Sequence, residues 1–300
     1  MFKKGDLTSK HIVIIIILIV SFAVILYFWW QFSPKGETDL EVCRNSVIAR
    51  GSVPVFKESV SLKCNTRAVC ITEKTCDNSA IYDKIIRVKS RDELELEIAK
   101  LMYDCWWMMG AGQVDYQGSG AGDNLYCAQC AIIDFDSSVQ DKYEKITYLE
   151  LLNEMRNNAI PNAETSYMKY VYETDSIEGF RNTIVNSSGG DFKVEDSYID
   201  LKIGRHALVT GIFREGKLTS LKGAGLIAGG VVVGGVVAFF GGPAGWGAAA
   251  IIIKGAVAAG GGYIGYTISS PGGDFLRPML IPFTADELNK LECKSFDTLI

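Results

Sequence analysis

The residues best suited to chemistry in this chain are its cysteines, and the closest pair of them is Cys127-Ala-Gln-Cys130. A CxxC pair acts as a redox dithiol when its first cysteine begins a helix, because the helix dipole lowers the thiol pKa. Here the strand-like residues 131–136 follow, which favours a structural role. A zinc knuckle is the other alternative, but Cys64, Cys70 and Cys76 are too widely spaced to complete it.

Histidine is the next candidate, and His206 is the only histidine outside the amino-terminal region. Any Ser-His or Cys-His catalysis would have to use it, yet no nucleophile motif accompanies it. We therefore expect a hydrogen-bonded histidine within a strand. Residues 117–122, QGSGAG, resemble a phosphate loop only in glycine content, because no Gly-Lys-Ser/Thr follows, and a flexible linker explains them equally well.

Asp134 and Asp136 alternate along the strand that follows the CxxC pair. Carboxylates at this spacing could bind a metal ion, but a solvated strand edge is the simpler interpretation. The sequence thus predicts no catalytic residue, no metal site and no cofactor, and the expected protein is not an enzyme. A net charge of -5 without any Lys/Arg cluster also argues against nucleic acid as a partner.

An apolar run at residues 12–30 predicts a transmembrane signal anchor, because its length matches the hydrocarbon core of a bilayer. Lys3, Lys4 and Lys10 precede the run, so residues 1–11 should form a cytoplasmic tail. Trp29 and Trp30 end it as an interfacial belt, and no small-x-small cleavage site follows. Residues 31–39 should then be a polar linker.

The eight cysteines all follow this anchor, and an even number outside the cytoplasm predicts up to four disulfides whose pairing the sequence leaves open. The disulfide candidates are Cys43, Cys64, Cys70, Cys76, Cys105, Cys127, Cys130 and Cys293. We therefore expect a cell-membrane protein with its main domain, residues 40–220, outside the cytoplasm.

The pattern of this domain predicts an α+β fold. Residues 52–62 and 81–88 are expected as strands, residues 64–76 as a cysteine-rich loop, and residues 127–135 as a further strand. Two helices have N-terminal capping signals, Ser90 with Glu93 and Thr147 with Glu150. Residues 110–124 should be a mobile loop, residues 165–174 and 177–185 are short elements of undecided type, and residues 198–213 should form a strand pair.

The glycine-rich apolar region, residues 221–270, contains glycines four residues apart, which is the spacing that lets helices pack closely in lipid. Gly-Gly-Pro at residues 241–243 divides it, so we favour a membrane-inserted helical hairpin. Lys254 would then lie near mid-membrane, lining a pore or an interface between copies. The alternatives are a single crossing and a segment packed on the domain until conditional insertion. The helix-packing candidates are Gly225, Gly229, Gly230, Gly234, Gly241, Gly245, Gly261 and Gly265.

Residues 104–110, DCWWMMG, carry large apolar groups around most of a helix, which predicts burial on more than one side. Core packing is the simpler interpretation, and an interface involving Trp106 and Trp107 is the alternative. Together with the lysine-flanked anchor, the CxxC pair and the glycine-rich tail, this segment resembles a group of uncharacterised membrane-anchored archaeal proteins. The resemblance is strongest over residues 95–136, and it implies an archaeal surface protein without implying any activity.

The sequence therefore favours a non-enzymatic envelope protein that mediates assembly or surface interaction. Its expected partners are the lipid bilayer and either further copies of the chain or other envelope proteins. A pore-forming or membrane-remodelling protein is the first alternative, and an extracytoplasmic thiol oxidoreductase with a reactive Cys127 is the second. Residues 271–300 are expected as a C-terminal tail with a short helix.

Overall fold

The structure, a computed structural model, describes residues 9–31, 38–53, 57–117, 125–187, 197–213, 240–241, 247–254, 262–270, 273–291 and 293–295. The chain divides into two compact units, Met1–Asp39 and Leu40–Ile300.

The first unit contains one long helix, α1 (Ser9–Gln31). This helix covers the apolar run that the sequence predicts as an anchor. Its large apolar side chains are exposed wherever they are described, from 47% at Ile15 to 63% at Leu18. Within the described part of the chain, no helix is both long and apolar enough to cross a membrane. Side chains in α1 are described only from Ile14 to Tyr27, so the crossing stays a prediction.

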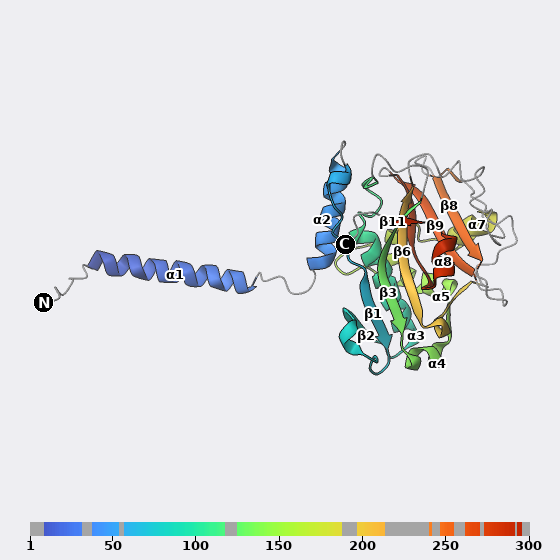
Figure 1. The fold of residues 1–300 in the computed structure, drawn as a ribbon, viewed down its shortest axis with the longest axis horizontal. Helices are drawn as coiled ribbons and strands as arrows, with labels where there is room; N and C mark the ends of the chain where they lie inside the picture. The colour runs from blue at the N-terminus through green and yellow to red at the C-terminus, as the bar shows by residue number, and fades with distance from the viewer. Residues whose placement is uncertain are drawn as a thin grey trace. The chain divides into compact units, whose positions relative to one another are not determined.

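The second unit is an α+β domain built on a mixed sheet (Figure 1). Counted from one edge, its first strands are β2 (Lys84–Arg87), β1 (Arg67–Thr72), β3 (Tyr126–Phe135), β6 (Arg205–Phe213) and β10 (Gly273–Pro282), in that spatial order. The strand β1 is parallel to β2 and β3, whereas β6 is antiparallel to β3 and β10. The predicted α+β class is therefore confirmed.

The sheet continues beyond β10 through β9 (Gly262–Ser270), β8 (Gly247–Lys254) and β7 (Phe240–Gly241), all antiparallel to their neighbours. The two-residue strand β11 (Lys294–Ser295) pairs with the start of β3. A separate small sheet pairs β4 (Lys145–Thr147) with β5 (Tyr198–Asp200).

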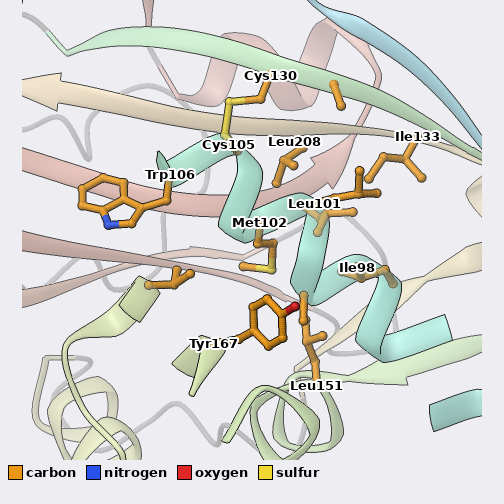
Figure 2. Packing of buried hydrophobic residues seen from close by; sticks show 14 of the residues in the cluster. Ile98, Leu101, Met102, Cys105, Trp106, Cys130, Ile133, Leu151, Tyr167 and Leu208 are labelled. Carbon is orange, nitrogen blue, oxygen red and sulfur yellow. A yellow bond between two sulfur atoms is a disulfide. The ribbon is translucent and has the colours of Figure 1, made fainter. Parts of the chain in front are cut away.

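One face of the large sheet is covered by α3 (Arg91–Met108), which contacts β3, β6 and β10. The Ser90 side chain accepts a hydrogen bond from the Glu93 backbone N–H and caps this helix as predicted. Figure 2 shows Ile98, Leu101 and Met102 of α3 among core side chains from the sheet and from other helices. The apolar α3 positions Leu94, Ile98, Leu101, Cys105 and Met108 are all buried.

Two short helices pack on α3 from the other side: α5 (Tyr148–Asn157) and α6 (Tyr167–Tyr172). The predicted capping box of Thr147 and Glu150 is present at the start of α5, and Pro161 lies beyond the end of this helix. The buried residues of α5 are Tyr148, Leu151, Leu152 and Met155, whereas Leu149 is only half-buried.

The opposite face of the sheet carries a smaller core beneath α8 (Ala285–Lys290). Its buried members are Leu125, Ala207, Val209, Leu276, Met279, Ile281 and Leu291. Gly211 of β6 is required on this face, because a Cβ there would lie 2.8 Å from both Leu125 Cδ1 and the Tyr126 carbonyl oxygen. The short helix predicted after residue 271 is thus present, but the strand β10 makes that tail an interior part of the sheet.

The remaining elements are α2 (Thr38–Ser52), α4 (Ser137–Tyr143) and α7 (Ile177–Ser187), with 3-10 turns η1 (Lys57–Ser59), η2 (Ser79–Ile81) and η4 (Leu201–Ile203). Both elements of undecided type, around residues 165–174 and 177–185, are helices.

Several local expectations were wrong. The strand expected at 52–62 is replaced by the end of α2 and by η1, and α2 buries Cys43 and Val47 on one face against the core. Most of the expected linker, residues 32–37, lies outside the described residues. The expected cysteine loop at 64–76 contains the buried strand β1. Residues 198–213 hold two strands, but β5 pairs with β4 while β6 lies in the large sheet, so they are not a hairpin.

The helical hairpin expected at residues 221–270 is corrected in its second half, where Gly247–Lys254 and Gly262–Ser270 are paired strands. The reason lies in residues 263–268, YIGYTI, whose aromatic and β-branched side chains favour a strand over a helix. Glycine spacing alone does not distinguish the two structures. Residues 214–239, the first half of the hairpin, lie outside the described residues.

Candidate functional site

The eight cysteines form four disulfides, and each cysteine lies in the described part of the chain: Cys43–Cys64, Cys70–Cys76, Cys105–Cys130 and Cys127–Cys293. The last of these joins residues 166 positions apart and ties β3 to the segment before β11. Disulfides of this density are typical of oxidising compartments and indicate an extracytoplasmic environment for this domain.

The CxxC pair is split between two disulfides. Residues three apart on a strand point to opposite faces, so Cys130 lies in the core beneath α3 while Cys127 lies on the opposite face, near Cys293. The structure therefore does not bring Cys127 and Cys130 together as a dithiol, and neither is a free thiol.

Trp106 is a core residue and not part of a surface. Its side chain is 1% exposed, contacts Phe275 edge-to-face at 5.7 Å between ring centroids, and lies 4.0 Å below the Arg277 guanidinium. Arg277 in turn forms an ion pair with Glu173. Trp107 is partly buried, and the Arg44 guanidinium covers its ring at 4.5 Å.

His206 lies buried in β6, on the face covered by α3, because it pairs in register with the core residue Ile133. Its ring contacts Phe135 at 5.4 Å, and burial lowers its pKa to about 4. Neither ring nitrogen has a hydrogen-bond partner within the described residues, which corrects the expectation of a hydrogen-bonded histidine. A neutral, enclosed imidazole is a poor general base.

Two of the eight glycine candidates lie in described residues, and both are in strands. Gly241 is in β7 and Gly265 is in β9, and Lys254 is the last residue of β8. Gln117 is buried, whereas residues 118–122 lie outside the described part. Also outside it are Gly225, Gly229, Gly230, Gly234, Gly245 and Gly261.

A hollow of about 390 Å³ lies where the carboxyl ends of β1 and β3 meet, and it is the best candidate site in the described structure. Its lining comes from β1, the β1–β2 connection, the end of β3, α4 and the start of β6. The chain leaves β1 toward β2 on one side and returns to β3 on the other. Such a topological switch point is where open α/β sheets commonly bind ligands.

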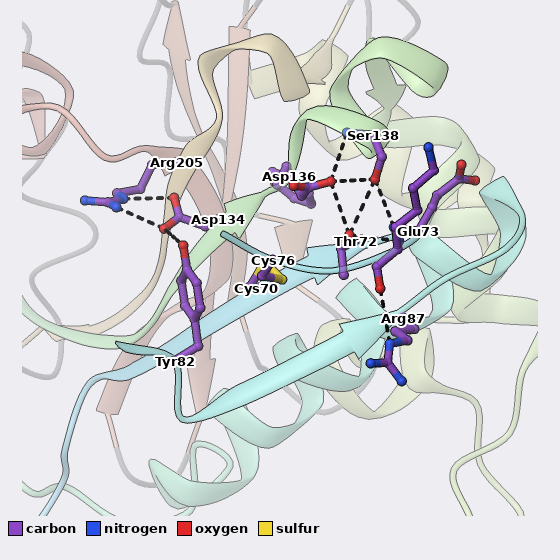
Figure 3. Close-up of a disulfide and its surroundings, with 12 residues drawn as sticks. Cys70, Thr72, Glu73, Cys76, Tyr82, Arg87, Asp134, Asp136, Ser138 and Arg205 are labelled. Atoms are coloured by element: carbon purple, nitrogen blue, oxygen red, sulfur yellow. Dashed lines mark hydrogen bonds and ion pairs between the residues drawn. A yellow bond between two sulfur atoms is a disulfide. The ribbon is translucent and has the colours of Figure 1, made fainter. Parts of the chain in front are cut away.

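Asp134, Arg205 and Tyr82 form one polar group in this hollow (Figure 3). Asp134 alternates with the core residues Ile133 and Phe135, so its side chain points away from α3. The Arg205 Nε and Nη2 each donate to Asp134 at 2.9 Å, and the Tyr82 hydroxyl donates to it at 3.0 Å. The Asp134 carboxylate raises the pKa of Arg205, and burial together with Asp134 raises that of Tyr82.

Asp136 forms the second polar group, at the start of α4. Its Oδ1 accepts hydrogen bonds from the Ser138 backbone N–H at 2.9 Å, the Ser138 hydroxyl at 2.5 Å and the Thr72 hydroxyl at 3.1 Å. Burial opposes ionisation of Asp136, but these hydrogen bonds outweigh it and lower the pKa of the carboxyl. Asp136 therefore stays negatively charged in this hollow across the neutral pH range.

The Cys70–Cys76 disulfide braces the wall between these groups, because it closes the turn that leads from β1 to Asp77 and Tyr82. The sequence pointed to both aspartates but missed Tyr82 and Arg205. These residues are 52 and 71 positions from Asp134, and no local motif joins them. Polar residues at the ends of strands were the only available signal.

Fold and site together define a disulfide-braced α+β domain with a polar hollow at the edge of its parallel strands. No protein-family model, curated protein or solved structure matches this chain.

Proposed function

We propose that this protein is a membrane-anchored envelope protein that displays its disulfide-braced domain outside the cytoplasm for non-enzymatic binding and assembly. The observation that carries the proposal is the pairing of all eight cysteines in the unit that follows α1. Thiols kept in a reducing cytoplasm do not form such a set.

The anchor is supported by α1. Its 23 residues correspond to about 34 Å of helix at 1.5 Å per residue, which is enough for a bilayer core. Apolar side chains exposed on consecutive residues are unfavourable in water, and the hydrocarbon core of a bilayer shields them from it. Lys3, Lys4 and Lys10 orient the amino terminus toward the cytoplasm.

Assembly is assigned to the glycine-rich segment that precedes β7. Residues 223–237 contain no charged side chain, and their glycines suit close contact with lipid or with a second copy of the chain. The pore and thiol oxidoreductase alternatives receive no comparable support from the described residues.

A topology experiment on the full chain tests the proposal. In a bacterial host, we expect the protein to stay in the membrane pellet after carbonate extraction and the domain to be digested by protease added to intact spheroplasts. A maleimide reagent should label the eight cysteines only after denaturation and reduction. The matched control replaces Lys3, Lys4 and Lys10 by Glu, which removes the positive-inside signal and should reduce the digested fraction. Extraction into the supernatant, or thiols that label without reduction, would contradict the proposal.

A further inference from the structure

We propose that the hollow at the carboxyl ends of β1 and β3 binds a small organic cation, an amine or a guanidinium compound. The proposal concerns the domain alone and does not depend on the membrane anchor. It rests on the cavity, on the charge of its walls and on the fixed position of one aromatic ring.

The cavity sets the size of the ligand. Its volume of about 390 Å³ lies within the usual range for small-molecule sites and far exceeds that of a single ion. Three separate stretches of the chain converge on it, residues 70–82, 134–140 and 203–205, so the walls are built by the fold and not by one loop. The Cys70–Cys76 disulfide fixes the most irregular of these stretches.

The charge of the walls determines the sign of the charge that the ligand carries. Among the lining residues, Asp77, Asp134 and Asp136 are acidic and Arg205 is the one cationic side chain. Arg205 is already engaged with Asp134 through two hydrogen bonds. The lining therefore presents two negative charges without a cation to balance them, which repels phosphates and carboxylates and attracts a cation.

Asp136 carries one of these charges in a defined position. The hydrogen bonds from Thr72 and Ser138 all end on Oδ1. Together with a backbone hydrogen bond from Ser137 they keep the carboxylate ionised, and an ionised carboxylate attracts a charged N–H donor.

Tyr82 adds an aromatic surface. Its hydroxyl is held by Asp134 at 3.0 Å, which restrains the ring at the wall of the hollow. Aromatic faces attract ammonium and guanidinium groups, and carboxylates beside an aromatic ring suit an organic cation better than a neutral polyol.

Binding is measured by calorimetry on the oxidised full chain in detergent micelles. The probe is agmatine, which carries an ammonium and a guanidinium group, and the comparison compounds are glutamate and glucose. We expect saturable binding of agmatine with a Kd of about 1 mM or tighter, weakened by added NaCl, and no binding of glutamate.

Two variants test the site. Asp77→Asn removes one charge from an exposed loop position and should weaken agmatine binding about fivefold. Asp136→Asn should act similarly, because asparagine also caps helices; if it fails to fold, Asp77→Asn decides. Glu164→Gln changes the same charge on an exposed turn outside the lining and should leave Kd unchanged. Absence of saturable agmatine binding, tighter binding of glucose, or an unchanged Kd in Asp77→Asn would overturn the proposal.

Discussion

Arg205 and His206 are neighbours in β6, yet strand alternation gives them opposite surroundings. Arg205 faces the hollow and pairs with Asp134, while His206 faces the core beside Phe135. Residue type alone pointed to His206 as the candidate for chemistry and overlooked Arg205. Burial, which a sequence reveals poorly for a lone polar residue, determines the difference.

His206 should make the domain sensitive to acid. Because burial lowers its pKa from 6.5 to about 4 in the folded state, the folded protein binds this proton more weakly than the unfolded chain. The contribution of neutral His206 to the free energy of unfolding is complete above pH 6.5. It should fall by about 3 kcal/mol as the pH drops to 4. Urea unfolding at pH 7 and pH 4 measures the loss. His206→Leu should lose less stability over this range than the parent, and an equal loss in both would refute the assignment.

Glu95 should change the stability of the domain with pH in the opposite direction to His206. Burial, reinforced by the nearby charge of Glu150, raises its pKa to about 7, although Arg91 partly opposes the shift. Folding therefore favours the protonated form, so the stability it gives is present below pH 4.5 and is lost as the pH rises to 7. Glu95→Gln should make the free energy of unfolding less dependent on pH between pH 5 and pH 8, as measured by urea unfolding. Glu97→Gln, on the same helix, is the control and should retain the parent profile.

At the scale of elements, the helices with local signals were predictable and those held by distant contacts were not. Caps at Ser90 and Thr147 mark α3 and α5 because the capping bonds are made within four residues. The helix α2 is held by the Cys43–Cys64 disulfide and by core packing of Val47. In the hollow, both aspartates were identified in advance, but their partners come from β6 and from the β1–β2 connection.

Two disulfides should differ in their effect on stability because they enclose loops of different length. Loop-closure entropy predicts about 5 kcal/mol for Cys127–Cys293, with a separation of 166, and about 2 kcal/mol for Cys70–Cys76, with a separation of 6. The double variants Cys127→Ala/Cys293→Ala and Cys70→Ala/Cys76→Ala avoid free thiols and serve as controls for each other. Urea unfolding should rank the first as the less stable, and the reverse order would show that native-state effects dominate.

At the scale of the whole molecule, the four disulfides link export to folding. Their combined loop-closure contributions are of the order of 10 kcal/mol, comparable to the total stability of an ordinary domain. A chain retained in a reducing cytoplasm should therefore leave its domain unfolded. In a bacterial host, loss of the periplasmic thiol oxidase should make the domain sensitive to a low protease concentration that spares the oxidised domain, while α1 still directs the chain to the membrane pellet. A domain that stays protease-resistant in that host would mean that core packing alone is sufficient, and the disulfides would then report the compartment without being required for the fold.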